Sequence, residues 1–310
     1  MNRGNMKMTI RFDDRVAVVT GAGAGLGRQH ALLLASRGAK VVVNDPGGAV
    51  DGAGGQNAAA DSVVAEIKAA GGQAVASYDS VADETSAQNI IDTAVKNFGR
   101  MDILIANAGV LRDRAFNNMS MEDFEFVMKV HLMGTVYCTK AAWPIMREQK
   151  YGRIVVTTSS SGTVGNFGQA NYGAAKMAIN GFINVMRTEG AKYNILLNAV
   201  SPAARTRMTE TILPEWVLAF MRPELVSPAV AWMASDKCTV SGEIISATAG
   251  SFSRVQYMQS EGVQFDPDQP VTIEMFDEKF DEIMDMSKLQ AHSMTLQRLE
   301  TRLRAMGKLK

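Results

Sequence analysis

The chain has 310 residues, 21% of them charged, and its lysines and arginines equal its aspartates and glutamates in number. This balance provides no strongly basic surface, so we expect neither a nucleic acid nor an acidic membrane as partner. The two cysteines, Cys138 and Cys238, are too few for a disulfide framework and indicate a reducing compartment. The three histidines lie far apart in the sequence, so we predict no metal site.

Targeting signals are not evident in the residues. The segment 1–11 carries positive charges without an apolar run, and no stretch approaches the ~20 apolar residues of a membrane span. The final Gly-Lys-Leu-Lys differs from a peroxisomal Ser-Lys-Leu address. We therefore expect a cytoplasmic protein.

The first predicted strand, Val16 to Thr20, is short, apolar and β-branched, as in a buried parallel strand. It is followed by the loop Gly21-Ala-Gly-Ala-Gly25-Leu26-Gly27 and by a helical pattern from Arg28 to Arg37. A glycine loop alone could be only a tight turn. Between a strand and a helix, however, it is typical of a dinucleotide site, where the backbone and the helix N-terminus hold a pyrophosphate.

The second strand, Lys40 to Asn44, ends at Asp45, about twenty residues beyond the glycines. A carboxylate there can accept hydrogen bonds from ribose hydroxyls and repels a 2′-phosphate, which favours NAD over NADP. The alternative is an aspartate that only stabilises the turn before Pro46. A long glycine-rich connection, 46–60, follows, and loops of this length are usually functional or mobile.

Strands and helices then alternate, which predicts an α/β fold with a Rossmann-like, doubly wound parallel sheet and ligands at the carboxyl ends of the strands. The expected elements are a helix at 58–70, a strand at 73–78, a helix at 84–98, a strand at 102–106, a helix at 121–150 and a strand at 153–158. Asp79 and Val81 follow the third strand, where an adenine ring could lie, and Asn107-Ala-Gly109 follows the fourth.

The stretch from Ser159 to Lys176 has the outline of an alcohol/carbonyl redox site. Tyr172 and Lys176 are one turn apart on a predicted helix, 172–193, and a nearby cation lowers the pKa of a phenol. Ser159 could hold a substrate oxygen while Tyr172 moves a proton. Taken alone, the four-residue spacing could also be a coincidence of a helix face.

The remaining core elements are a strand at 195–200, a helix at 228–234 and a last strand at 243–247. Between them, Met208, Trp216, Phe220 and Met221 could form an apolar lid or simply pack. Beyond the acidic, proline-containing linker 265–270, one apolar helix face carries Ile273, Phe276, Phe280, Ile283 and Met284, and a second carries Leu296, Leu299, Leu303 and Met306. We therefore expect an N-terminal arm at 1–12, one dehydrogenase domain at 13–255 and a helical C-terminal extension at 256–310.

In its motifs the chain resembles the short-chain dehydrogenase/reductase family. The matching residues are Thr20-Gly21-x-x-x-Gly25-x-Gly27, Asn107-Ala-Gly109, Ser159 and Tyr172-x-x-x-Lys176. Asn44-Asp-Pro-Gly-Gly48, Leu111-Arg-Asp-Arg, Ala142-Trp and Gly165-Asn-Phe-Gly-Gln-Ala-Asn-Tyr172 further resemble one branch. That branch is the (3R)-hydroxyacyl-CoA dehydrogenase unit of the peroxisomal multifunctional enzyme, also described as a 17-beta-hydroxysteroid dehydrogenase.

The resemblance implies a set of roles. Tyr172 would be the acid/base, Lys176 would lower its pKa and bind the nicotinamide ribose, and Ser159 would orient the substrate oxygen. The implied cofactor contacts are Gly21, Gly25, Leu26, Gly27, Asp45, Asp79, Val81, Asn107, Gly109, Tyr172, Lys176 and Thr206. His131 stands where the family has asparagine and could relay protons or be structural, and Pro202-Ala203 replaces Pro-Gly, which weakens the inference for Thr206.

These residues predict NAD-dependent oxidation of a secondary alcohol, with (3R)-3-hydroxyacyl-CoA as the expected substrate. A steroid or other bulky alcohol, an NADP-dependent carbonyl reductase and a catalytically silent scaffold are the alternatives. The resemblance also implies a homodimer or homotetramer formed through the helices at 121–150 and 172–193.

Overall fold

The computed structural model describes residues 9–54, 58–206, 214–291 and 295–309. The chain forms two compact units, Met1–Arg254 and Val255–Lys310. Met208 and the third of the three histidines, His292, lie outside the described ranges, as does the side chain of Leu296.

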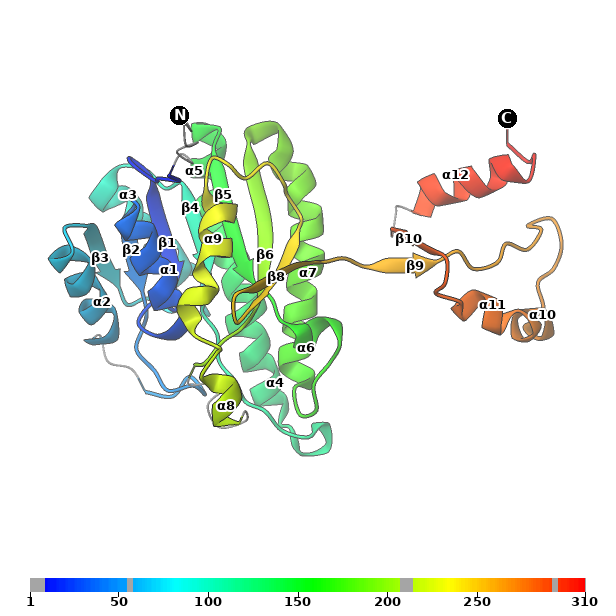
Figure 1. Cartoon of the computed structure of the whole chain (residues 1–310), viewed down its shortest axis with the longest axis horizontal. Helices are drawn as coiled ribbons and strands as arrows, with labels where there is room; N and C mark the ends of the chain where they lie inside the picture. The colour runs from blue at the N-terminus through cyan, green and yellow to red at the C-terminus, as the bar shows by residue number, and fades with distance from the viewer. Residues whose placement is uncertain (1–8, 55–57, 207–213, 292–294, 310) are drawn as a thin grey trace, which may run out of the picture. The chain divides into compact units, whose positions relative to one another are not determined.

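The first unit is built on an eight-stranded sheet in the order β3-β2-β1-β4-β5-β6-β7-β8 (Figure 1). Neighbouring strands from β3 to β7 pair in parallel. Every residue of β1, β4 and β5 is buried, and most of them are apolar on both faces, as in a central parallel strand; Thr20, Arg153 and Thr157 are the polar exceptions. The strands are β1 (Val16–Thr20), β2 (Lys40–Asn44), β3 (Gln73–Ser77), β4 (Ile103–Ala106), β5 (Gly152–Thr157), β6 (Ile195–Ala203), β7 (Ile244–Thr248) and β8 (Ser251–Val255). The predicted Rossmann-like parallel sheet is thus confirmed.

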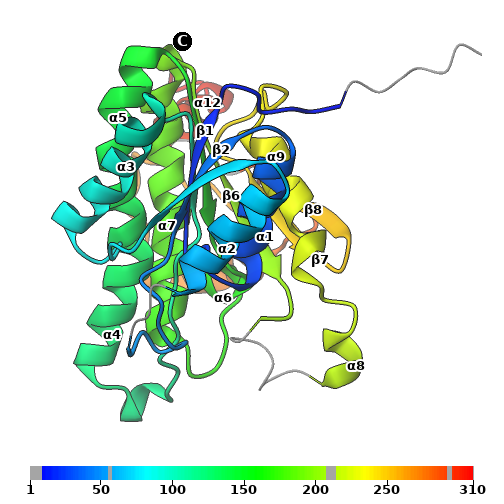
Figure 2. The same cartoon turned by 90° about the vertical axis from the view of Figure 1, so that its left-hand side faces the viewer.

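Helices cover both faces of this sheet (Figure 2). On one side lie α1 (Gly25–Ser36), α2 (Ala58–Ala69) and α9 (Ser227–Ala234). On the other lie α3 (Glu84–Phe98), α4 (Met121–Met128), α5 (Gly134–Gln149) and α7 (Ala170–Gly190). Two short helices, α6 (Ser160–Thr163) and α8 (Glu215–Leu218), interrupt the loops after β5 and β6.

The strand order reverses at β1, which pairs with β2 on one side and with β4 on the other. The chain therefore leaves β1 and β4 in opposite directions, and a crevice forms at the carboxyl ends of these two strands. The glycine loop follows β1 and Asn107 follows β4, so the topology brings both predicted motifs to this crevice.

Several predicted boundaries were wrong. The expected helix at 121–150 is interrupted by a π-helix, Lys129–Met133, between α4 and α5. The helix after β1 begins at Gly25 rather than Arg28. The strand at 243–247 does not end the sheet, because Ala249 and Gly250 have positive φ (47° and 80°) and turn the chain into β8. Two residues with positive φ suit a tight hairpin turn, although alanine rarely supplies one.

The second unit contains β9 (Met258–Ser260), which pairs antiparallel with β10 (Leu289–Ala291), and the helices α10 (Ile273–Glu278), α11 (Phe280–Met284) and α12 (Thr295–Ala305). The first of the two expected amphipathic helices is divided at Lys279, whose φ and ψ (−105°, 5°) are not helical. Ile273, Phe276, Phe280 and Met284 remain exposed. None of the helices within the described ranges is long and apolar enough to cross a membrane.

Candidate active site

The glycine loop after β1 is held tightly against the strand. A Cβ on Gly27 would lie 2.1 Å from the carbonyl oxygen of Gly21, so only glycine permits this approach. Gly25 has a φ of +54°, which places it in the left-handed region at the first residue of α1. Gly21, Gly25 and Leu26 line a cavity of about 440 Å³. Gly27 does not line this cavity and instead packs against the backbone of Gly21.

Asp45 lies beside this loop at the end of β2. One carboxylate oxygen accepts the backbone N–H of Gly23 at 2.8 Å, and the other accepts that of Gly47 at 2.8 Å. The carboxylate therefore shapes the turn and also faces the cavity, whose lining includes Asp45. Both interpretations of Asp45 from the sequence, the turn and the ligand contact, are compatible with this geometry.

Residues after β3 and β4 form the next part of the wall. Val81, Asn107 and Gly109 line the cavity, and the amide nitrogen of Asn107 donates to the carbonyl oxygens of Thr20 and Gly21 at 3.1 and 3.2 Å. Asp79 is absent from the lining. Its carboxylate instead accepts hydrogen bonds from Ser77 and Asn89, so its expected side-chain contact with adenine is not supported.

Ser159, Tyr172 and Lys176 line the same cavity, as does Thr206. Ser159 follows β5, which β1 and β4 separate from β2 and Asp45, so these three residues lie at the other end of the cavity. Ser159 is the N-cap of α6, and its hydroxyl accepts the N–H of Ser161 at 3.1 Å. Tyr172 and Lys176 share a face of α7, with the Lys176 Nζ 5.4 Å from the centre of the Tyr172 ring. The Lys176 ammonium donates to the carbonyl oxygen of Thr157 at 2.6 Å.

The electrostatics of this pair differ from the sequence expectation. Burial raises the pKa of Tyr172, the charge of Asp113 raises it further, and a hydrogen bond with Ser159 opposes the rise. Burial also lowers the pKa of Lys176 to about 7. The expected lowering of the Tyr172 pKa by Lys176 was therefore wrong for this structure, because the loss of hydration dominates at both groups.

His131 lies in the π-helix and packs edge-on against Tyr172, with 5.0 Å between the ring centroids. Its Nε2 is 2.8 Å from the carbonyl oxygen of Val110 and 3.1 Å from the Val110 nitrogen. Burial and the charge of Lys176 hold the pKa of His131 well below its usual range. These contacts favour the structural role of His131 over the proton relay.

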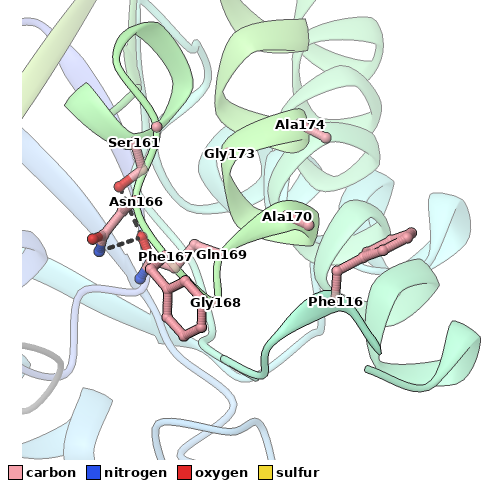
Figure 3. A pocket seen from close by; sticks show the side chains of 10 residues that line it. Phe116, Ser161, Asn166, Phe167, Gly168, Gln169, Ala170, Gly173 and Ala174 are labelled. Atoms are coloured by element: carbon pink, nitrogen blue, oxygen red, sulfur yellow. Dashed lines mark hydrogen bonds between the residues drawn. The ribbon is translucent and has the colours of Figure 1, made fainter. Parts of the chain in front are cut away.

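A second cleft of about 390 Å³, named here the outer cleft, has lining residues in common with the cavity. Figure 3 shows the residues that line the outer cleft. The two share Ser161, Asn166 and Gln169. Gln169 is buried between them, where its amide oxygen accepts hydrogen bonds from Ser161 and Asn166 at 2.8 and 3.2 Å. The rings of Phe116 and Phe167, which are 70% and 89% exposed, give the outer cleft its apolar character.

Sequence reasoning missed the segment Leu111–Arg114, which was noted only as a mark of the family branch. The carbonyl oxygen of Arg112 accepts the side-chain amide of Asn171 at 3.0 Å, and Asp113 accepts the amide of Gln169 at 2.7 Å. This segment thus joins the end of β4 to the start of the helix that carries Tyr172. Its charged residues were the available signal, but their spacing gives no indication of a contact 59 residues away.

The residues present fit a nicotinamide dinucleotide. The tight backbone loop and the N-terminus of α1 can hold a pyrophosphate, Asp45 lies within reach of a ribose, and Tyr172 and Lys176 lie at the opposite end of one continuous cavity. Ser159 and Tyr172 provide hydroxyl groups where a carbonyl or alcohol oxygen would approach.

Comparison with known proteins identifies the family. A family model described as short chain dehydrogenase matches residues 15–215. A short-chain type dehydrogenase/reductase of Mycobacterium tuberculosis is 52% identical over 88% of this chain and 95% of its own length. Peroxisomal multifunctional enzyme type 2 of Drosophila melanogaster is 48% identical over 97% of this chain, which spans 50% of that enzyme. A hydroxyacyl-CoA dehydrogenase of Mycobacterium tuberculosis is 41% identical over 66% of this chain and 65% of its own.

Solved structures are also similar. The full-length fly enzyme has a TM-score of 0.81 with 42% identity and covers 97% of this chain, which covers 51% of it. A 7α-hydroxysteroid dehydrogenase in complex with NADH and 7-oxo glycochenodeoxycholic acid has a TM-score of 0.71 with 28% identity, covering 77% of this chain and 95% of that one. With its parallel sheet, glycine loop and Ser159, Tyr172 and Lys176 in one cavity, the chain belongs to the short-chain dehydrogenase family of oxidoreductases.

Proposed function

We propose that this protein oxidises a secondary alcohol to a ketone with NAD as the hydride acceptor. The observation that carries the proposal is the single cavity that has Asp45 and the glycine loop at one end and Ser159, Tyr172 and Lys176 at the other. A bound dinucleotide would supply the hydride chemistry, which no side chain can provide. The protein then has to hold the alcohol, fix its orientation and accept its proton.

The proposed roles follow from the positions of the side chains. Tyr172 accepts the hydroxyl proton of the alcohol, and the Ser159 hydroxyl donates a hydrogen bond to the developing carbonyl oxygen. Before the alcohol binds, the one proton of the Ser159 hydroxyl is directed to Tyr172, and this hydrogen bond lowers the pKa of Tyr172; with the alcohol bound, that proton is donated to the substrate oxygen instead. Lys176 is anchored by the Thr157 carbonyl at 2.6 Å, which fixes its ammonium beside the phenol and within reach of a ribose.

The preference for NAD rests on Asp45. Its carboxylate accepts hydrogen bonds from two backbone N–H groups, which hold it beside the cavity, and a 2′-phosphate there would be repelled by its like charge. Binding titrations with NADH and NADPH test this point. A higher affinity for NADPH would reverse the assignment.

For the substrate we propose a (3R)-3-hydroxyacyl-CoA. The relative named hydroxyacyl-CoA dehydrogenase and the similarity to peroxisomal multifunctional enzyme type 2 support this class. The adjoining outer cleft offers apolar rings beyond Gln169 that suit an acyl substrate. Rates of NADH formation with a panel of hydroxyacyl-CoA and hydroxysteroid substrates test the proposal.

A steroid alcohol is the second candidate, favoured by the similarity to the 7α-hydroxysteroid dehydrogenase structure with its bound bile acid. The same panel separates the two, because the proposal requires the acyl-CoA to be oxidised with the higher kcat/KM. If neither class is oxidised while NADH still binds, the silent-scaffold alternative would be favoured.

We also propose a homodimer or homotetramer. Met177 and Val185 are exposed on the outer face of α7, which offers apolar surface for a second copy. Light scattering of the purified protein would give the mass of the assembly. The division into 1–12, 13–255 and 256–310 and the cytoplasmic location stay predictions, which limited proteolysis and cell fractionation respectively would check.

A further inference from the structure

The described part of the glycine-rich loop after β2, residues 46–54, is fastened to the segment after β4, and the name glycine-rich loop refers to these residues below. The carbonyl oxygen of Val50 accepts the N–H of Leu111 at 3.0 Å, and the Nε of Arg112 donates to the carbonyl oxygen of Asp51 at 3.0 Å. Val50 and Leu111 both line the cavity that we assign to the cofactor. The two hydrogen bonds therefore join two segments that both contribute to the wall of this cavity.

Arg112 is the centre of this junction. A terminal nitrogen of its guanidinium forms an ion pair with Asp123 in α4 at 3.0 Å, and its central carbon lies 4.0 Å from the centre of the Phe126 ring. A Cβ on Gly52 would be 2.8 Å from the same ring, so the loop packs directly on Phe126. One side chain thus makes a hydrogen bond to the loop, an ion pair with α4 and a cation–π contact with a ring that the loop also touches.

The planar guanidinium is needed for this combination. It can donate to Asp51 and Asp123 in different directions while its face stays on the aromatic ring. A lysine ammonium is a compact charge, and it cannot stack and donate along two such fixed directions at once. The side chain is 25% exposed, so these interactions are only partly screened by water.

We propose that Arg112 is a positioning residue that fastens the glycine-rich loop over the bound dinucleotide and thereby slows its release. The inference rests on the proposed function, because it requires the cavity to hold a nicotinamide dinucleotide. The hydrogen bonds of the loop with Leu111 and Arg112 have to break before these two segments of the cavity wall can separate. In many enzymes such an opening step, rather than the chemistry, limits turnover.

The test is the rate of NADH dissociation, measured by stopped-flow fluorescence with excess ADP-ribose as the displacing ligand. We expect Arg112→Ala to dissociate NADH about tenfold faster, the effect of losing one charge-assisted hydrogen bond and one cation–π contact. Arg112→Lys should fall between this variant and the wild type. Arg114→Ala is the matched control, because the described structure shows no side-chain hydrogen bond or ion pair at Arg114, and its rate should equal that of the wild type.

A dissociation rate in Arg112→Ala equal to that of Arg114→Ala would overturn the proposal. If Arg112→Ala does not fold, as judged by its thermal transition, Arg112→Lys decides, and a wild-type rate in that variant would overturn the proposal as well. If part of a variant protein is unfolded, the fluorescence amplitude falls, but NADH dissociates from the folded part at the wild-type rate. A wild-type protein that shows no NADH signal would instead refute the proposed function.

Discussion

The contact between Gly109 and His131 leads to a quantitative prediction. A Cβ at position 109 would lie 2.2 Å from the Cε1 of His131 and 3.0 and 3.1 Å from its two ring nitrogens. Gly109 is not among the residues with positive φ, so alanine suits the backbone and the steric clash is the main cost. The ring cannot easily withdraw, because it is 3% exposed, is held by the backbone of Val110 and faces Tyr172.

We therefore expect Gly109→Ala to lower the free energy of unfolding by about 1–3 kcal/mol, the usual cost of overpacking. Displacing His131 also moves the Tyr172 ring, and an error of about 1 Å in such a group lowers kcat roughly 100-fold. Chemical denaturation and initial rates of NADH formation measure the two effects. Gly181→Ala is the matched control, because its Cβ would meet nothing within 4 Å in the same chain, and in helix α7 it should stabilise by roughly 0.5–1 kcal/mol. Gly181 lies on the α7 face proposed for the oligomer, so light scattering has to give the same mass for this variant as for the wild type before the stabilities are compared.

A double-mutant cycle decides whether the clash is the cause. His131→Ala removes the ring, so in that background Gly109→Ala should cost less than about 0.5 kcal/mol, with a coupling energy of at least about 0.5 kcal/mol. Equal costs of Gly109→Ala in the two backgrounds would refute the reasoning. The cause would then lie elsewhere, in the backbone after β4.

Three further predictions concern the chemistry. Tyr172→Phe should lower kcat at least about 100-fold while NADH still binds, and near-normal turnover would exclude Tyr172 as the acid/base. Because the charge of Asp113 raises the pKa of Tyr172, Asp113→Asn should lower that pKa. Oxidation requires the Tyr172 phenolate, so the pH at which kcat/KM reaches half of its maximum should be lower in Asp113→Asn than in the wild type. An unchanged half-maximal pH would contradict the assigned effect of Asp113 on the Tyr172 pKa. Asp45→Ser removes the carboxylate that repels a 2′-phosphate, and the ratio of kcat/KM with NADP to that with NAD should rise at least about tenfold. A ratio that stays constant would show that Asp45 only stabilises its turn.

The parts of the fold that the sequence predicted well depend on local signals. The apolar run Val16–Thr20, the glycines after it and the alternation of strands and helices specify the parallel sheet without knowledge of distant contacts. The four-residue spacing of Tyr172 and Lys176 is also a local signal, because it puts both side chains on one face of α7, where both line the cavity.

The features that sequence reasoning missed depend on tertiary contacts. One extra residue in the turn at Lys129–Met133 forms the π-helix, and nothing in its composition distinguishes it from an ordinary helix. The pKa of Tyr172 is raised by burial of its phenol and by the charge of Asp113, which lies 59 residues earlier in the chain. Asp79 has the expected position along the chain, but its carboxylate accepts hydrogen bonds from Ser77 and Asn89 and does not line the cavity.

The central claim is tested most directly by the initial rate of NADH formation when the protein is given NAD and a (3R)-3-hydroxyacyl-CoA. The proposal predicts turnover that Tyr172→Phe loses, with a higher kcat/KM than for hydroxysteroids and a lower one when NADP replaces NAD. If hydroxysteroids are oxidised with the higher kcat/KM, or if Tyr172→Phe retains full activity on the acyl-CoA, the proposed function is contradicted.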